Sequence, residues 1–391
     1  MPDALHFPNG LDAGRFLAEY WQRRPLLLRA ALPDFRCPLP ADELAGLACE
    51  PQVEARMVLE RGPQGPWELR HGPFDEDTFA TLPDSHWTLL VQDVDKHVPE
   101  VASLLRAFGF IPNWRLDDIM ISYAADQGSV GPHVDAYDVF LIQVEGERRW
   151  RIDASEAPDL SCIPGLDLRI LEHFAPTDDW VLGPGDILYL PPGVPHWGIA
   201  EGECMTWSVG LRAPAWRELA ADWCEHQGAR ALPAGRYRDP GLSPQTHGGE
   251  VCPEVFAHIR STLEQALVAA DPDDFRAWLG AVLSEPKEHL RLAPAEPPFT
   301  SAEFRNAFEA QGLLLRHGWS KLLFCRGDGG DDLLFANGEV HRLPKAQGVL
   351  LQVLTDDRDL PYSELAPWLA EPVALELLCR LYNGGHYVFA D

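Results

Sequence analysis

Several features that would assign a protein to a class are absent from this chain of 391 residues. Its eight cysteines are scattered and none lies in a Cys-x-x-Cys pair, so neither a zinc finger nor a disulfide framework is expected. No apolar run approaches the roughly 18 residues that a membrane-spanning helix needs. Residues 1–6 lack the basic start and apolar stretch of a signal peptide. We therefore expect a cytoplasmic protein with reduced thiols and no membrane contact.

Positive charge is also scarce in this sequence. Lys and Arg number 32 against 60 Asp and Glu, which gives a formal net charge of −28 at pH 7 with histidine neutral. A surface this acidic repels nucleic acid and anionic lipid and attracts basic proteins. We expect a basic protein partner and no direct binding of nucleic acid.

The order of predicted elements divides the chain into three parts. The composition, 46% hydrophobic and 24% charged, is that of a protein with substantial buried cores. Between about residues 114 and 212, short strands alternate with Gly- and Pro-containing turns, which is typical of a sandwich or barrel. The strands are expected at 119–123, 137–144, 148–152, 187–190 and 205–211, with a turn at 145–147.

The rest of the chain contains more helical patterns. Before the β region, a helix is expected at 12–21, a strand at 26–28, a strand at 87–94 and a helix at 99–108. After it, helices are expected at 215–227, 253–270 and 273–283, with a Gly/Pro-rich linker before Cys252. A proline-rich segment then precedes a small α/β module. We place the three parts at 1–213, 214–285 and 286–391.

Three residues of the β region form a candidate metal site. His133 and Asp135 lie two apart in Gly131-Pro132-His133-Val134-Asp135, so in a strand both side chains would point to the same side. His196 follows 61 residues after Asp135, just beyond the turn at 191–193. Two histidines and one carboxylate form the facial triad of non-haem Fe(II) oxygenases, although zinc hydrolysis can use the same ligands.

Arg148 favours the oxygenase over the hydrolase. Strand alternation places it on one face with Trp150 and Ile152, which marks that face as core. A buried guanidinium is costly unless an anion meets it, and its planar fork suits a carboxylate. The distal carboxylate of 2-oxoglutarate would meet both requirements, and a buried salt bridge to Asp or Glu is the structural alternative.

Two further residues are candidates for binding substrate. Tyr137 shares the parity of His133 and Asp135, and Asp118 shares that of the strand residues Met120 and Ser122. A Tyr ring and an Asp together suit a substrate guanidinium, by stacking and by ion pairing. Core packing of Tyr137 and a solvated strand end for Asp118 remain the structural alternatives.

These residues and their surroundings resemble the JmjC-type ribosomal oxygenases. The resemblance is carried by residues 131–140 with 146–151, by Phe16-Leu17-Ala18-Glu19-Tyr20-Trp21 near the start, and by Gly185-Asp186-Ile187-Leu188-Tyr189-Leu190-Pro191-Pro192-Gly193 before His196. The segment Ser208-Val209-Gly210-Leu211-Arg212-Ala213-Pro214 closes the core in the same style. The sequence is most similar to the bacterial branch that hydroxylates an arginine of a large-subunit ribosomal protein.

The resemblance carries specific expectations about fold and chemistry. It implies a double-stranded β-helix of the jelly-roll or cupin type in 1–213, a helical dimerisation region in 214–285 and a winged-helix module in 286–391. His133, Asp135 and His196 would bind Fe(II), and Arg148 would bind 2-oxoglutarate. With O2 the enzyme would hydroxylate an arginine of a basic ribosomal protein, giving succinate and CO2, and it would form a homodimer.

Other functions use the same features. A non-catalytic acidic cupin scaffold could bind a basic protein partner without any metal. A zinc-dependent cupin hydrolase or isomerase could use the same three ligands. A DNA-reading winged helix fails on charge, because the tail helices at 363–369 and 372–382 contain only Arg380 as a positive residue.

Overall fold

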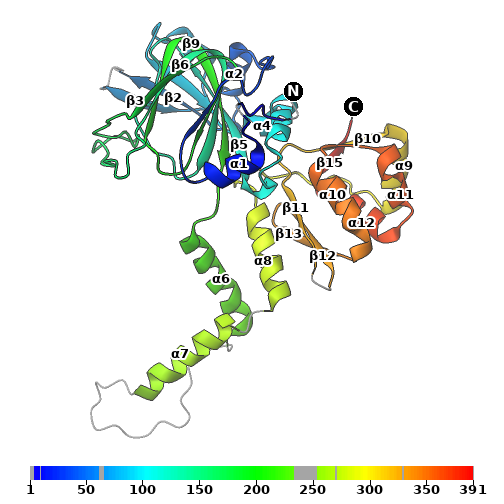
Figure 1. Ribbon diagram of the computed structural model, residues 1–391. Helices are drawn as coiled ribbons and strands as arrows, with labels where there is room; N and C mark the ends of the chain where they lie inside the picture. Colours follow the sequence, from blue (N-terminus) through cyan, green and yellow to red (C-terminus); the bar gives the residue numbers. More distant parts are fainter. Residues whose placement is uncertain are drawn as a thin grey trace. The chain divides into compact units, whose positions relative to one another are not determined.

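The computed structural model describes residues 4–8, 10–60, 66–232, 253–268, 271–327 and 330–390. The chain forms two compact units, which are described separately (Figure 1). The first unit contains Met1–Ala213 with His317–Trp319, and the second contains Pro214–Arg316 with Ser320–Asp391. Within the described ranges, no helix combines the length and the apolar character that crossing a bilayer requires.

The first unit is built on one antiparallel sheet of nine strands. A β core in this part of the chain was predicted from the sequence. Eight strands follow the order β1-β8-β6-β9-β5-β4-β2-β3, and β7 pairs with β6. The strands are β1 (Leu26–Leu28), β2 (Ala55–Glu60), β3 (Trp67–His71), β4 (Trp87–Val91), β5 (Leu116–Ala124), β6 (Asp138–Ile152), β7 (Asp178–Leu182), β8 (Ile187–Leu190) and β9 (His196–Leu211).

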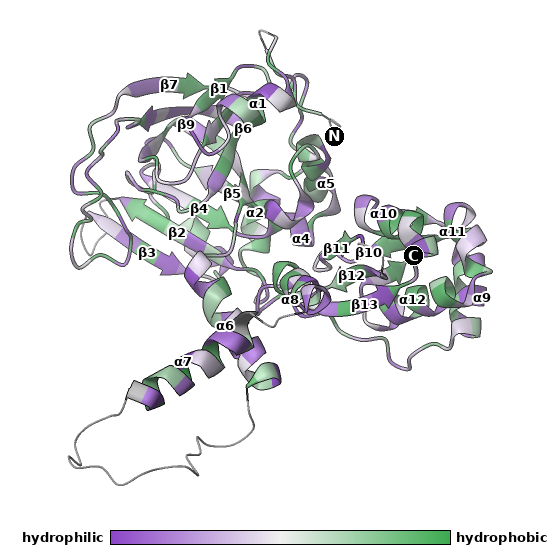
Figure 2. Ribbon diagram, turned by 60° about the horizontal axis from the view of Figure 1, so that its bottom comes forward, coloured by the Kyte–Doolittle hydropathy of each residue, from purple (hydrophilic) through white to green (hydrophobic). Residues whose placement is uncertain are grey.

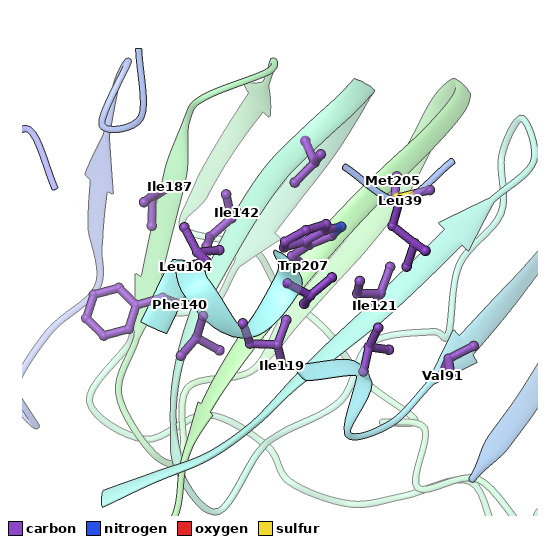
Figure 3. Packing of buried hydrophobic residues seen from close by; sticks show 14 of the residues in the cluster. Leu39, Val91, Leu104, Ile119, Ile121, Phe140, Ile142, Ile187, Met205 and Trp207 are labelled. Carbon is purple, nitrogen blue, oxygen red and sulfur yellow. The ribbon is translucent and has the colours of Figure 1, made fainter. Parts of the chain in front are cut away.

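Side-chain alternation along these strands gives the sheet two different faces. One face carries the largest hydrophobic core, in which Ile121, Phe140, Ile142 and Trp207 are fully buried (Figure 3). Short helices add side chains to this core: α1 (Ala13–Glu19), α2 (Ala41–Leu47), α4 (Val94–His97), α5 (Pro99–Ala102) and the 3-10 helix η1 (Ser103–Phe108). Helix α3 (Glu76–Ala80) and the 3-10 helix η2 (Asn113–Arg115) complete the unit.

We call the opposite face of the sheet the inner face. It carries a smaller apolar cluster that includes Leu141, Trp150, Ile152 and Leu188. This face also carries polar residues. Alternation along β6 places Arg148 on the same side as Trp150 and Arg149 on the opposite side. The candidate site therefore lies on the less apolar of the two faces.

Strand β6 differs from the prediction. We expected two strands separated by a turn at residues 145–147, but β6 is continuous from Asp138 to Ile152 because β9 pairs with it along its whole length. The register shifts between Gln143 and Glu147, which marks a bulge rather than a turn. Gly146 has a φ of +64° there, and a Cβ at this position would clash with the carbonyl oxygen of Glu203.

A buried polar network ties the N-terminal segment to the sheet. The Tyr189 hydroxyl donates to Oδ1 of Asp138 at 2.6 Å and accepts from the Gln22 amide nitrogen at 2.8 Å. The Gln22 side chain and Arg115 Nη2 reach Oδ2 of Asp138 at 2.9 and 2.8 Å. The fully buried carboxylate of Asp138 is thus satisfied on both oxygens, as burial of a charge requires.

The second unit begins with three helices, α6 (Trp216–Ala231), α7 (Pro253–Val268) and α8 (Pro272–Ser284), close to the predicted positions. The predicted linker before Cys252 lies outside the described residues. The remaining elements are α9 (Ser301–Gln311), β10 (Leu313–Arg316), β11 (Leu322–Cys325), β12 (Asp332–Ala336), β13 (Glu339–Leu343), η3 (Lys345–Gln347), α10 (Gly348–Asp356), β14 (Asp359–Pro361), α11 (Tyr362–Leu369), α12 (Pro372–Asn383) and β15 (Tyr387–Phe389).

Two small antiparallel sheets organise this α/β module. Their strand orders are β14-β10-β15 and β11-β12-β13. Helix α12 carries both hydrophobic and hydrophilic residues (Figure 2). Its apolar side buries Leu377, Leu378 and Leu381 in the core of the module. Thr300 begins α9 with a reciprocal cap, because its hydroxyl accepts from the Glu303 amide while the Glu303 carboxylate accepts from Thr300.

Candidate metal centre

His133, Asp135 and His196 lie together on the inner side of the first unit. Each places one nitrogen or oxygen within 4.8 Å of the others, and no second group of three such ligands occurs among the described residues. Nε2 of His196 lies 3.6 Å from Oδ2 of Asp135, and the two imidazole centroids are 4.3 Å apart. The three residues selected from the sequence therefore share one site.

Backbone hydrogen bonds join the two segments that carry these side chains. The His133 amide donates to the His196 carbonyl at 3.0 Å, and the His196 amide donates back at 2.9 Å. The Gly193 amide donates to the carbonyl of Asp135 at 2.9 Å. The start of β9 and the loop before β6 are thereby held in a defined relation.

His133 and Asp135 do not lie in a regular strand, so strand alternation is not what brings their side chains together. Only His133 forms a β-bridge, an isolated one with His196, and the chain leaves extended pairing immediately afterwards. Gly131 has a φ of +77° and Pro132 has no amide hydrogen, so a regular ladder cannot form here. Asp135 reaches the site from the loop rather than by strand alternation.

Both imidazoles are oriented by main-chain carbonyl groups. Nδ1 of His133 lies 2.9 Å from the Gly131 carbonyl oxygen, and Nδ1 of His196 lies 3.0 Å from that of Val194. A carbonyl only accepts, so each Nδ1 carries the proton and each Nε2 keeps a free lone pair. This tautomer is the one that metal-binding histidines commonly adopt.

Burial favours the neutral form of His196. His196 is 2% exposed, and desolvation, followed by the proximity of His133, lowers its pKa well below the ordinary histidine value. The Asp135 carboxylate opposes this shift without reversing it. His196 is therefore an uncharged nitrogen ligand at neutral pH.

Ser129 and Trp197 connect the two ligand segments a second time. The Trp197 indole Nε1 donates to Oγ of Ser129 at 2.7 Å, and the same hydroxyl accepts from the Gly131 amide at 3.0 Å. Ser129 is 2% exposed, so solvent competes little for these bonds. The Ser129 hydroxyl thus links the turn at Gly131, before His133, to Trp197, the residue after His196.

Arg148 points into the same interior. It is 5% exposed, its Cζ lies 5.8 Å from the Trp150 ring, and that ring lies 5.9 Å from the His196 ring. Nη1 donates to Oγ of Ser122 at 3.1 Å, while Nε and Nη2 are buried without a hydrogen-bond partner among the described residues. The salt-bridge alternative is absent from these residues, and two donors are left to hold an anion.

Tyr137 lies near the metal ligand Asp135, and both Tyr137 and Asp118 lie near Arg212. Burial raises the pKa of Tyr137 to about 12, with a further contribution from the negative charge of Asp135 and a smaller one from Asp118. The Arg212 guanidinium stands 5.3 Å from the Tyr137 ring centroid, and its Nε lies 2.8 Å from Asp117. Asp118 is 8% exposed within β5, so it is not a solvated strand end.

Several residues of this site were not anticipated from the sequence. Ser122 contacts Arg148, and Arg212 lies over the Tyr137 ring. Ser129 and Trp197 bond each other between the two ligand segments. Parity with Met120 marks Ser122 as facing the interior, and Arg212 stands in the segment that closes the core. Ser129 carries no comparable signal, because its partner lies 68 residues away.

The donor set fits a divalent transition metal. Two neutral imidazoles and one carboxylate bind Fe(II) facially and leave three positions open, and the same set also binds zinc. The two buried donors of Arg148 are explained by a carboxylate held beside the metal. A hydrolytic zinc site has no use for them, so the surroundings favour an oxygenase.

Comparison with protein families gives two matches. Residues 103–219 match the family described as JmjC domain, and residues 266–388 match the ROXA-like winged helix. The first covers the three ligand residues and Arg148. The second covers the α/β module of the second unit.

Comparison with known proteins covers nearly the whole chain. The ribosomal protein uL16 3-hydroxylase of Escherichia coli is 37% identical over 96% of this chain and 96% of its own length. The X-ray structure of E. coli ycfD superposes with a TM-score of 0.85 at 36% identity, covering 99% of this chain and 100% of the other. The structure of that ribosomal oxygenase with cobalt and 2-oxoglutarate gives 0.82 at 35% identity, with the same coverage.

Proposed function

Because the chain belongs to the JmjC family of ribosomal oxygenases, we propose that it hydroxylates an arginine side chain of a basic large-subunit ribosomal protein. It is a 2-oxoglutarate oxygenase with a jelly-roll catalytic core and a C-terminal winged-helix module. The E. coli relative is a hydroxylase of ribosomal protein uL16, which supports a ribosomal protein as substrate. The arginine assignment rests on the chemistry around Tyr137 and on the branch that the sequence resembles.

In this proposal His133, Asp135 and His196 hold Fe(II). When bound, Fe(II) and 2-oxoglutarate supply the oxidant from O2, with succinate and CO2 as co-products and one oxygen atom entering a substrate C–H bond. The Nδ1 hydrogen bonds keep both imidazoles aimed at the metal position. The burial of His196 prevents a proton from competing for its lone pair at neutral pH.

Arg148 carries the proposal. Its two buried donors without a partner match the distal carboxylate of 2-oxoglutarate, and Ser122 holds the third nitrogen in place. Tyr137 remains a neutral phenol and Asp118 a nearby acid, so the pair can receive a guanidinium by stacking and ion pairing. The acidic surface attracts the basic substrate.

The test of this assignment uses Arg148→Ala and Arg148→Lys. Loss of two charge-assisted hydrogen bonds should raise the KM for 2-oxoglutarate by about 100-fold in the alanine variant, with partial recovery in the lysine variant. Tandem mass spectrometry of the product should place the added oxygen on an arginine side chain. An unchanged KM would reject the role of Arg148, and oxygen on another residue type would reject the arginine assignment.

A homodimer and a cytoplasmic location also belong to this proposal. Three apolar side chains of α7 are partly exposed, Phe256 at 64%, Ile259 at 43% and Leu263 at 48%. Ile259 and Leu263 lie one helical turn apart on the same side of α7, and residues 214–285 are the proposed dimerisation region. Replacing Ile259 and Leu263 by Asp should convert a dimer to a monomer in light scattering. A wild-type protein that is monomeric in light scattering would reject the proposed homodimer.

A further inference from the structure

Arg56 is a second arginine on the inner face of the sheet. It pairs across β2 and β4 with Leu90, and Leu90 pairs across β4 and β5 with Ser122, the residue that contacts Arg148. Residues paired in this way point to the same face of the sheet. Arg56 and Ser122 are two strands apart, which corresponds to a backbone separation of about 10 Å. Arg56 and Arg148 therefore approach the same interior from strands on either side of β5.

Arg56 is half-buried, and its guanidinium is incompletely satisfied by hydrogen bonds among the described residues. Its Nε is buried without a hydrogen-bond partner among the described residues, as is Nε of Arg148. Other arginines of the sheet and its margins have carboxylate partners, as Arg70 has Glu68 at 2.6 Å and Arg149 has Glu201 at 2.7 Å. Residues 61–65, which follow β2 outside the described part, include no Asp or Glu.

Arg56 also lies near Tyr137, one of the two side chains proposed to receive the substrate. The positive charge of Arg56 acts to lower the pKa of the Tyr137 hydroxyl, whereas the negative charges of Asp135 and Asp118 act to raise it. A cation at this place cannot bind the positive side chains of a basic substrate. It can donate hydrogen bonds to carbonyl oxygen atoms, and the guanidinium fork accommodates one or two carbonyl groups.

We propose that Arg56 binds main-chain carbonyl oxygens of the protein substrate next to the residue that is oxidised. The inference rests on the proposed function, because it concerns how that substrate is held. Main-chain carbonyl groups occur in every polypeptide, so a cation here adds affinity without opposing the acidic surface. Arg56 would then hold the peptide backbone while Tyr137 and Asp118 receive the side chain.

The experiment measures steady-state kinetics of the full-length Fe(II) enzyme with a synthetic peptide around the arginine oxidised in ribosomes. Arg56→Ala should raise the KM for the peptide by about 10-fold or more with kcat little changed, as expected for loss of charge-assisted hydrogen bonds. Arg56→Lys should recover part of the effect. Shortening the peptide from each end should locate a residue whose removal weakens binding to wild type but not to Arg56→Ala.

Arg70→Ala is the matched control. Arg70 lies on the neighbouring strand β3 and pairs with Met57, so it projects from the opposite face while carrying the same charge. Its removal should leave the KM for the peptide unchanged, and both variants should keep the wild-type KM for 2-oxoglutarate and affinity for Co(II).

Two results would overturn the inference. One is an unchanged KM for the peptide in Arg56→Ala. The other is a parallel loss of peptide, 2-oxoglutarate and Co(II) binding with a lower Tm, which would show a structural role. If wild type oxidises no ribosomal protein, the proposed function fails and the inference with it. If wild type is active and Arg56→Ala matches it, the inference alone fails.

Discussion

Asp135 supplies the one carboxylate among the three metal ligands, and its side chain is 23% exposed. We predict that Asp135→Ala abolishes succinate formation, because two imidazoles alone bind Fe(II) weakly and leave the metal without its anionic ligand. The fold should survive, since no buried apolar contact is lost. Succinate assays and thermal unfolding check this prediction. Turnover retained in the variant would contradict the proposed site.

The raised pKa of Tyr137 predicts a specific pH behaviour. Burial and the nearby Asp135 raise it to about 12, so the phenol keeps its proton well above the ordinary tyrosine value. The KM for the peptide substrate should therefore show no ionisation of Tyr137 between about pH 7 and pH 10. Tyr137→Phe should change KM by the same factor across this range. A transition near pH 10 that disappears in Tyr137→Phe would contradict the assignment.

The three candidate metal ligands and Arg148 could be selected from the sequence because each left a local signal. Arg148 stands in strong β alternation beside Trp150 and Ile152, and the structure buries all three. His133 and Asp135 were found by their spacing, although a loop rather than a strand positions them. Arg56 was not found, because its strand β2 was itself not predicted from the sequence.

At the scale of elements, the hydrogen bond between Trp197 and Ser129 joins the two segments that supply the ligands. We predict that Ser129→Ala weakens Co(II) binding by about 10-fold, a size typical of lost outer-shell support at metal sites. Trp197→Phe removes the same bond while keeping the aromatic contact with Phe174, so it should have a similar effect. Calorimetric titration of the metal-free protein measures both. Wild-type affinity in both variants would contradict the prediction.

Long-range pairing explains which elements could be predicted. Strands made almost wholly of buried apolar residues, such as β4 and β8, were expected, as were the helices of the second unit. The strands β2 and β3 were missed because charged residues, Arg56 and Glu60 in one and Glu68 and Arg70 in the other, interrupt their apolar pattern. The continuity of β6 was missed because only its pairing with β9 carries the chain through Gly146.

At the scale of the whole molecule, the net charge of −28 predicts a salt dependence. Raising ionic strength from about 0.1 M to about 1 M shortens the screening length from about 10 Å to about 3 Å. The KM for a basic protein substrate should rise several-fold, because the long-range attraction is lost. The KM for 2-oxoglutarate should change little, since Arg148 is buried. Steady-state assays at several salt concentrations compare the two. If both KM values rose equally with salt, the proposed attraction of the basic substrate by the acidic surface would be contradicted.

The most direct measurement is the intact mass of ribosomal proteins treated with the enzyme. Ribosomes from a strain lacking it would be incubated with the enzyme, Fe(II), 2-oxoglutarate and O2, alongside an Asp135→Ala control. The account predicts that one basic large-subunit protein gains a single oxygen atom, and only with the wild-type enzyme. If 2-oxoglutarate is consumed while no ribosomal protein gains mass, the substrate assignment is wrong. If neither occurs with iron verified in the site, the oxygenase assignment itself is contradicted.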